Sequence, residues 1–292
     1  IQRHPGHQTR TAASTFVRLG EVPSQRKEPQ MAGYSLHIGL NHVDPTAYGG
    51  WDGALQGCLS DAASMETLAL AAGYSTSSLL ECDATSARVI SALGDLARRA
   101  SGGDICLVTY SGHGGQIDDV EGDEDEGKDE TWVLFDRQLI DDELYRAWSQ
   151  FASGVRLLVL SDSCHSGSVN RDLADTRVDR AMPSLICAQD NAARRATYEL
   201  VKAQARRNQD ADVVASVLLI SGCQDDQVSF DGARNGAFTE SLLEVWADGG
   251  FAGDYRAFHQ AIVANMSTDQ TPGLDDVLVK DAAFLTQQPF TI

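Results

Sequence analysis

The sequence predicts a three-layer α/β fold, in which a mostly parallel central sheet carries helices on both faces. Three strand-like segments, at residues 34–40, 104–110 and 155–161, are largely apolar along their length, so both of their faces are expected to be buried. Segments with helical periodicity separate them, and such crossover helices cover the faces of a parallel sheet. With 292 residues, of which 42% are hydrophobic, the chain can bury the core that this fold requires.

The remaining elements are expected in a regular order. A helix starts at Asp61 and ends at Gly73, because glycine commonly follows the last helical turn. Thr85 can cap a second helix, whose apolar face is formed by Val89, Ile90, Leu93, Leu96 and Ala97. A third helix spans about 141–152. A strand at 216–221, helices near 236–248 and 254–267, and an extended segment at 277–285 complete the fold.

Breaks in the apolar pattern predict the division of the chain. Residues 1–33 show no sustained period and are expected to form a flexible extension. Residues 34–170 and 214–292 are expected to form two parts of one domain. A polar, Arg-rich linker at 171–213 joins them, and residues 192–205 within it could form a helix.

Charge and cysteine usage exclude several classes of protein. The formal net charge of -19 argues against nucleic-acid binding, which depends on basic patches. The six cysteines form no CxxC pair, which argues against a disulfide scaffold or a zinc site. We find no apolar run of about 18 residues and no export signal, and therefore expect a cytoplasmic protein without a membrane partner. We also expect a monomer.

Chemically reactive residues follow two of the predicted strands. His113 stands among glycines directly after residues 104–110, and Cys164 follows residues 155–161. The carboxyl ends of parallel strands meet at one edge of a sheet, so the two side chains are expected to lie within reach if these strands are neighbours. An imidazole that takes the proton of a thiol activates it for acyl transfer. The amides of Gly114 and Cys164 could then bind the oxyanion.

Other readings of these residues carry less weight. His165 is a competing base, but adjacent residues on an extended segment point apart. A cysteine near a strand is more often a small core residue than a nucleophile, and we expect this for the five other cysteines, Cys58, Cys82, Cys106, Cys187 and Cys223.

Several motifs together resemble the caspase-like peptidases and, among them, the metacaspases and their prokaryotic relatives, the orthocaspases. The matching segments are GCLSDA (57–62), YSGHGGQ (110–116), DETWVLFD (129–136), LIDDEL (139–144), LSDSCHSGS (160–168) and SGCQDDQVSFDGARNGAFTESLL (221–243). A histidine about 50 residues before the cysteine is also typical of caspases. The resemblance implies a caspase-hemoglobinase fold, with a large-subunit-like part to about residue 170 and a small-subunit-like part from about 214. It also implies cysteine endopeptidase activity.

The expected primary specificity is for Arg or Lys. Asp162 lies two residues before Cys164, and Asp61 lies in the motif GCLSDA. Two carboxylates that face a pocket beside the thiol would hold a basic side chain. Asp162 could instead cap amides at the strand end, and Asp61 could be a helix N-cap. The resemblance points the same way, because metacaspases cut after Arg or Lys and use positions that match Cys58, Asp61, Ser111 and Asp162. The expected partners are proteins or peptides with accessible Arg or Lys.

Calcium is a possible cofactor. Nine of the thirteen residues from Asp118 to Glu130 are acidic, and Ca²⁺ takes six to eight oxygen ligands, although a solvated acidic loop would look the same. The resemblance implies a site at Asp129, Asp141 and Asp142. A fourth position matches Arg171, with Asp172 one residue later, so this chain departs from the pattern there.

The Arg-rich linker suggests that the enzyme cuts itself. A peptidase that prefers basic residues could cleave after any of the linker arginines, which are Arg177, Arg180, Arg194, Arg195, Arg206 and Arg207. Two alternatives stay open. One is a catalytically silent caspase-like module with a regulatory or scaffolding role, and the other is a related enzyme with a different specificity, such as for Asp.

Overall fold

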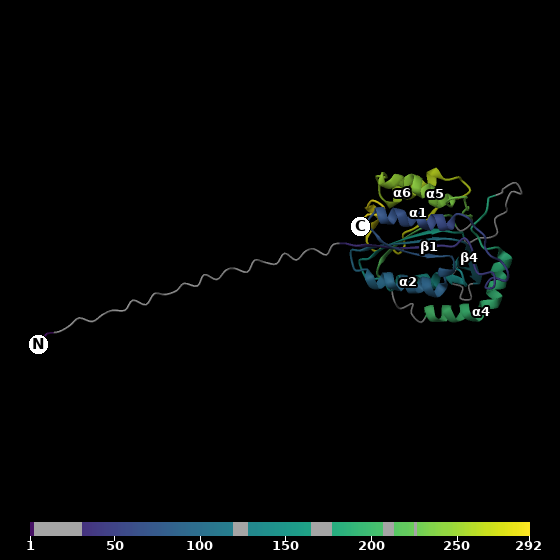
Figure 1. Ribbon diagram of the computed structural model, residues 1–292, viewed down its shortest axis with the longest axis horizontal. Coiled ribbons are helices and arrows are strands. Elements are labelled where there is room, and N and C mark those ends of the chain that lie inside the picture. The colour runs from purple at the N-terminus through teal and green to yellow at the C-terminus, as the bar shows by residue number, and fades with distance from the viewer. Residues whose placement is uncertain (3–30, 119–127, 165–176, 207–212, 225–226) are drawn as a thin grey trace. The chain divides into compact units, whose positions relative to one another are not determined.

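A six-stranded sheet forms the centre of residues 31–292 in this computed structural model (Figure 1). The structure describes residues 1–2, 31–118, 128–164, 177–206, 213–224 and 227–292. In spatial order the strands are β2 (Ser75–Leu80), β1 (Gly33–Gly39), β3 (Ile105–Ser111), β7 (Arg156–Asp162), β8 (Ser216–Ser221) and β9 (Gly273–Asp275). All neighbours pair in parallel except β8 and β9, which are antiparallel. The mostly parallel sheet is therefore confirmed.

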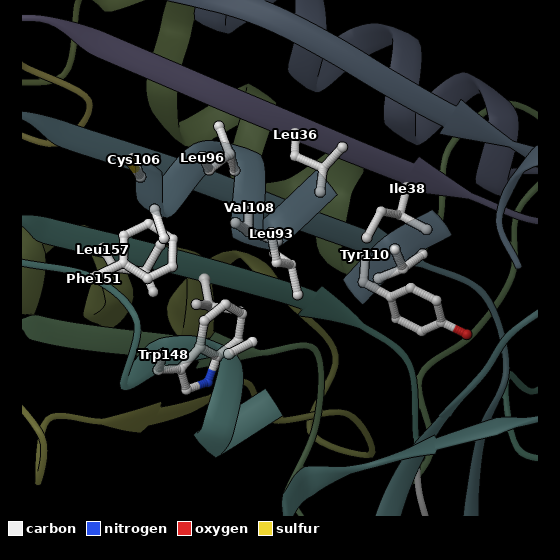
Figure 2. Close-up of a cluster of buried hydrophobic side chains, with 14 of the residues drawn as sticks. Leu36, Ile38, Leu93, Leu96, Cys106, Val108, Tyr110, Trp148, Phe151 and Leu157 are labelled. Atoms are coloured by element: carbon white, nitrogen blue, oxygen red, sulfur yellow. The ribbon is translucent and has the colours of Figure 1, made fainter. Parts of the chain in front are cut away.

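Helices cover both faces of this sheet. In Figure 1, α1 (Cys58–Ala71), α5 (Ala237–Trp246) and α6 (Tyr255–Asn265) lie on one side, and α2 (Ser86–Arg99) lies on the other. The helix α3 (Asp141–Trp148) packs beside α2. Figure 2 shows the core on the α2 side, where Leu36, Val108 and Leu157 of three adjacent strands face Leu93 and Leu96 of α2. The predicted three-layer arrangement is confirmed.

A second sheet lies beside the first and was not predicted. Its antiparallel strands are β4 (Gly114–Asp118), β5 (Lys128–Val133) and β6 (Gln138–Ile140). The linker helix α4 (Ser184–Arg206) contacts β4 and α3, and Figure 1 shows it beside β4. It is longer than the helix considered at 192–205. Because β4 closely follows β3 in the chain and contacts α4, the second sheet lies between the end of β3 and the linker helix.

Some predicted boundaries were wrong. The first helix begins at Cys58, so Asp61 lies in its first turn and Gly57 takes the N-cap position. The extended segment expected at 277–285 overlaps the short helix α7 (Ala282–Thr286), which the Asp281 side chain caps by accepting a hydrogen bond from the Ala283 amide (2.9 Å). The polar edge strand β2 gave no apolar signal and was missed. None of the helices in the described ranges has the length and hydrophobicity of a membrane span.

Candidate active site

The two strands that carry the reactive residues are neighbours. β3 and β7 pair in parallel, with Ser111 opposite Asp162 at their carboxyl ends. His113 and Cys164 each follow two residues later, so both emerge at the same edge of the sheet, as predicted. Both side chains are buried, Cys164 completely. His165 and Ser166 lie outside the described residues.

His113 is held as a neutral base. Its Nε2 lies 3.1 Å from the Gly53 carbonyl oxygen, which can only accept, so Nε2 carries the proton and donates it. Its Nδ1 is buried and has no hydrogen-bond partner among the described residues. Burial lowers the pKa of His113 to about 4, although contacts with the backbones of Gly53 and Ala181 act in the opposite direction. The lone pair on Nδ1 is therefore available to take a proton at neutral pH.

Aromatic and backbone contacts fix the orientation of this ring. The Trp51 ring packs on it, with centroids 4.8 Å apart and an interplanar angle of 56°. The His113 carbonyl accepts hydrogen bonds from the Tyr110 hydroxyl (2.6 Å) and the Val133 amide (2.9 Å). His113 therefore occupies a fixed position between β3 and the second sheet.

The side chain of Arg180 fills a pocket beside these two residues. We call it the carboxylate pocket and define it by Asp61, Asp162 and Asp231. Arg180 Nη2 lies 2.7 Å from Asp61 Oδ2 and 2.9 Å from Asp231 Oδ1, and Nη1 lies 2.9 Å from Asp162 Oδ2. Arg180 is fully buried. Burial lowers its pKa, but the surrounding acids outweigh this and hold the pKa well above its usual value.

Neighbouring groups position the carboxylates. Asp61 Oδ1 accepts from the Asn235 side chain (2.9 Å) and the Gly236 amide (3.0 Å). Burial raises the pKa of Asp61, against the opposing effect of Arg180. Asp162 accepts from the hydroxyls of Ser229 (2.6 Å) and Thr239 (2.7 Å). Ser229 uses the Asp162 oxygen that the guanidinium leaves available, Oδ1, whereas Thr239 shares Oδ2 with Arg180 Nη1.

The other two residues that sequence reasoning assigned to this pocket also line it. Ser111 Oγ donates to Asp61 Oδ2 (2.7 Å) and accepts from Arg180 Nη1 (2.9 Å). Cys58 is fully buried at the start of α1, and burial raises its pKa to about 12. It therefore contributes an uncharged thiol. The predicted set of Cys58, Asp61, Ser111 and Asp162 thus lies around a guanidinium.

The backbone carbonyl of Arg180 lies against the two amides predicted to bind an oxyanion. Its oxygen accepts a hydrogen bond from the Gly114 amide (2.8 Å) and another, longer one from the Cys164 amide (3.4 Å). Paired amides at a carbonyl oxygen stabilise the negative charge that develops there when a nucleophile attacks. The carbonyl with this arrangement belongs to the bond between Arg180 and Ala181.

Backbone hydrogen bonds and two isolated bridges, Asp179 with Phe230 and Gly114 with Ala181, hold residues 178–182 at this edge. The Arg180 amide donates to the Ser229 carbonyl (2.8 Å), and the Asp231 amide donates to the Val178 carbonyl (2.8 Å). On the far side of the Arg180–Ala181 bond, the Met182 amide donates to the Gly114 carbonyl (2.7 Å). Added strands are a common way for enzymes and adaptors to bind peptides.

The other linker arginines lie elsewhere. Arg177 stacks on the Phe230 ring, with its guanidinium 3.7 Å from the ring centroid, and pairs with Asp269. Arg194 and Arg195 belong to α4, whose helical backbone is not extended. The side chain of Arg206 and all of Arg207 lie outside the described residues.

Three of the residues expected to bind calcium, Asp129, Asp141 and Asp142, lie in the described part of the chain and do not form a metal site there. No group of three or more His, Cys, Asp or Glu side chains within the described ranges is arranged to hold a metal ion. Asp129 is buried and forms an ion pair with Lys202 of α4. Asp141 and Asp142 occupy the first turn of α3, and Asp172 lies outside the described residues.

Sequence reasoning missed several residues of this site. Asp231 and Gly236 lie in the motif at 221–243, which carried the resemblance but was given no residue roles. A Cβ atom at Gly236 would lie 2.5 Å from Arg180 Cζ, so only glycine leaves room for the guanidinium. The Gly53 carbonyl that orients His113 belongs to a loop with no recognisable signal. Chain topology, which the sequence pattern did not give in detail, brings these groups together.

Comparisons with known proteins agree on one family. The family model described as the caspase domain matches residues 34–283. Metacaspase-1 of Saccharomyces cerevisiae is 30% identical over a region that covers 82% of this chain and 64% of the relative. Metacaspase-1 of Eremothecium gossypii is 27% identical over a region that covers 71% of this chain and 54% of the relative. The chain thus spans between half and two thirds of the length of these relatives.

Solved structures agree with this. Protein GSU0716 from Geobacter sulfurreducens superposes with a TM-score of 0.82 at 49% identity, covering 89% of this chain and 98% of that chain. Caspase-1 from Spodoptera frugiperda superposes with a TM-score of 0.56 at 13% identity, over 89% and 94%, which is a likeness of fold alone. The resemblance stated from the sequence and the fold that it implied are therefore confirmed.

Proposed function

Because this chain belongs to the caspase domain family, we propose that it is a cysteine endopeptidase that cuts after Arg and, less efficiently, after Lys. We further propose that its first substrate is its own Arg180–Ala181 bond. One observation carries both parts of the proposal. The side chain of Arg180 fills the carboxylate pocket, while its carbonyl oxygen accepts hydrogen bonds from the Gly114 and Cys164 amides.

The charges around the pocket support specificity for a basic residue. Three carboxylates face one guanidinium, so an acidic side chain in the same place would be repelled by each of them. For a single pair of charges 4 Å apart near a protein surface, the interaction amounts to about 4 kcal/mol. This argues against specificity for Asp.

The geometry also supports Arg over Lys. The two terminal nitrogens of Arg180 contact different carboxylates, Asp162 through Nη1 and both Asp61 and Asp231 through Nη2. A planar guanidinium spans these groups at once, whereas an ammonium is a single point of charge. Lys would therefore leave at least one buried carboxylate without its partner.

The proposed reaction at this bond uses these groups in turn. His113 Nδ1 takes the proton of Cys164, and the sulfur attacks the Arg180 carbonyl carbon. The oxyanion is bound by the Gly114 and Cys164 amides. As the intermediate collapses, His113 gives the proton to the Ala181 nitrogen, and the bond to Ala181 breaks. Water then hydrolyses the thioester between Cys164 and Arg180, which releases a carboxylate and regenerates the thiol.

The same geometry supports control of the enzyme by its linker. While Arg180 occupies the carboxylate pocket, no other substrate can place a basic side chain there. We propose that cleavage is the first step towards an open site, and that substrates in trans are proteins with accessible Arg or Lys.

Calcium activation remains part of the proposal, supported only by the match of Asp129, Asp141, Asp142 and Asp172 to the metacaspase pattern. In the intact chain, Lys202 supplies a positive charge at Asp129. Calorimetric titration of the uncleaved Cys164→Ala protein with CaCl₂ tests binding without turnover. Binding that is lost in the Asp141→Ala variant supports the site, and no binding heat rejects it.

A panel of fluorogenic peptides that differ only in the residue before the cleaved bond tests the proposed activity. We expect turnover with Arg, slower turnover with Lys, and none with Asp or Ala. The Cys164→Ala variant is the control and should be inactive with every peptide. Equal turnover of the Asp peptide would contradict the specificity, and activity in Cys164→Ala would contradict the mechanism. An inert wild-type protein would favour a silent regulatory module.

A further inference from the structure

We infer that this enzyme selects its substrates at a second position, two residues after the cleaved bond, where an apolar side chain enters a preformed pocket. We call it the Met182 pocket and define its walls by Val43, Tyr48 and Val133. The inference rests on the proposed function, because it treats residues 178–182 as the enzyme's own bound substrate. It adds a specificity determinant on the side of the leaving amine.

The Met182 side chain is buried in this pocket. Only 1% of Met182 is exposed, and it forms a separate apolar cluster with Val43, Tyr48 and Val133. Each wall residue is at most 3% exposed. Ala47 and Trp51 complete the enclosure on the enzyme side, while Ile186 and Cys187 of α4 pack on it from the linker.

Hydrogen bonds within the body of the enzyme hold the three walls of the pocket. The Tyr48 hydroxyl donates to the Leu134 carbonyl (2.7 Å), which fixes its ring. The Val43 amide donates to the Asp52 carbonyl (2.9 Å), and the Val133 amide donates to the His113 carbonyl (2.9 Å). A pocket whose walls are fixed in advance binds a side chain without the cost of ordering those walls.

The backbone sets which substrate residue reaches the pocket. Gly114 donates its amide to the Arg180 carbonyl (2.8 Å) and accepts from the Met182 amide (2.7 Å). These two bonds bracket the Arg180–Ala181 bond, so the side chain at the second position after the cut always faces the same walls. Trp51 contacts both this cluster and the His113 ring. Filling the pocket therefore also buttresses the catalytic base.

The chemistry of the walls defines the class of side chain. They offer aliphatic and aromatic carbon, and the Tyr48 hydroxyl is already engaged with Leu134. Burying a methionine or leucine side chain stabilises a complex by about 1.5–3 kcal/mol relative to leaving it exposed. A charged side chain would lose its hydration without gaining a partner. We expect Met and Leu to be preferred, Ala to be poor, and Asp and Lys to be excluded.

Self-cleavage provides the first test. In full-length chains that carry Met182→Leu, Met182→Ala or Met182→Asp, the rate of cutting after Arg180 is followed by mass spectrometry. We expect Met182→Leu to cut at nearly the parental rate, Met182→Ala about tenfold more slowly, and Met182→Asp more slowly still. Equal rates for all four chains would overturn the inference. Absence of cutting even in the parent would instead contradict the proposed function.

Peptides tested in trans separate recognition from effects on the linker fold. Internally quenched peptides RVDRAXPS, with X as Met, Leu, Ala or Asp, are cut by the processed enzyme, and kcat/KM is compared. We expect the Met peptide to exceed the Ala peptide by about tenfold. In a Val43→Ala enzyme this ratio should fall. In the control enzyme Val89→Ala, which makes the same substitution at a buried position of α2, the ratio should persist. If both variants keep the parental ratio, or if the parental enzyme cuts the Met and Ala peptides equally well, the pocket does not select substrates.

Discussion

Replacing Arg180 tests whether a guanidinium neutralises the carboxylate pocket. In an uncleavable Cys164→Ala background, Arg180→Ala leaves Asp61, Asp162 and Asp231 buried together without a cation. Removing one partner of a buried ion pair typically costs 3–5 kcal/mol, because the remaining charge stays out of water. We expect a loss of this size in the free energy of unfolding at pH 7.

The loss should depend on pH in a defined direction. Burial already raises the pKa of Asp61, and removing Arg180 takes away the cation that opposes this rise, so the folded variant binds a proton more readily than the unfolded chain does. Its stability relative to the parent therefore improves as the pH falls from 7 towards 5. Urea unfolding followed by tryptophan fluorescence, at both pH values, measures this difference.

The matched control is Arg177→Ala, three residues earlier in the same linker. Its side chain is 44% exposed and pairs with one partly exposed carboxylate, Asp269, so we expect a change of less than about 1 kcal/mol. Agmatine should enter the vacated pocket of Arg180→Ala and, at ten times its Kd, restore about 1.4 kcal/mol. A loss no larger than that of Arg177→Ala, or no response to agmatine beyond that of the parent, would refute the reasoning.

Two further predictions use other features of the structure. Gly236→Ala places a Cβ 2.5 Å from Arg180 Cζ, so it should abolish cutting after Arg while circular dichroism shows that the protein stays folded. Gly94→Ala in α2 is the control. Cutting by Gly236→Ala at the parental rate would contradict the pocket geometry. Burial lowers the pKa of His37 to about 4. As the pH falls below about 6.5, His37 therefore takes up a proton in the unfolded chain but not in the folded one. By pH 5 this lowers the free energy of unfolding by about 2 kcal/mol. The stability lost between pH 7 and 5 should therefore shrink by that amount in His37→Gln, and an unchanged loss would show that His37 is not held neutral.

The sequence predicted the parts of this protein that follow simple patterns. Largely apolar strands such as residues 155–161 indicated a buried parallel sheet, and that in turn placed His113 and Cys164 at one edge. Asp162, two residues before Cys164, and Asp61, in the motif at 57–62, could be assigned to a pocket for a basic side chain. The topology of a parallel sheet supplied the rest.

The features that were missed depend on contacts between distant segments. β2 is an edge strand rich in serine, whose hydroxyls bond to neighbours such as the Ser35 carbonyl and Glu66, so it lacks an apolar pattern. The second sheet is built from three short strands, β4, β5 and β6. Asp231 and Gly236 reach the pocket from the loop after β8, far along the chain from Asp61. Periodicity carries no information about such long-range placement.

Identification of the first bond cut in the intact wild-type chain tests the central claim most directly. Freshly purified protein is incubated, and its fragments are measured by intact-mass spectrometry and amino-terminal sequencing. The account predicts a new amino terminus at Ala181, absent from both Cys164→Ala and Arg180→Ala. A first cut at another residue, such as Arg206 or Arg207, or a chain that stays whole while cleaving Arg peptides, would contradict it.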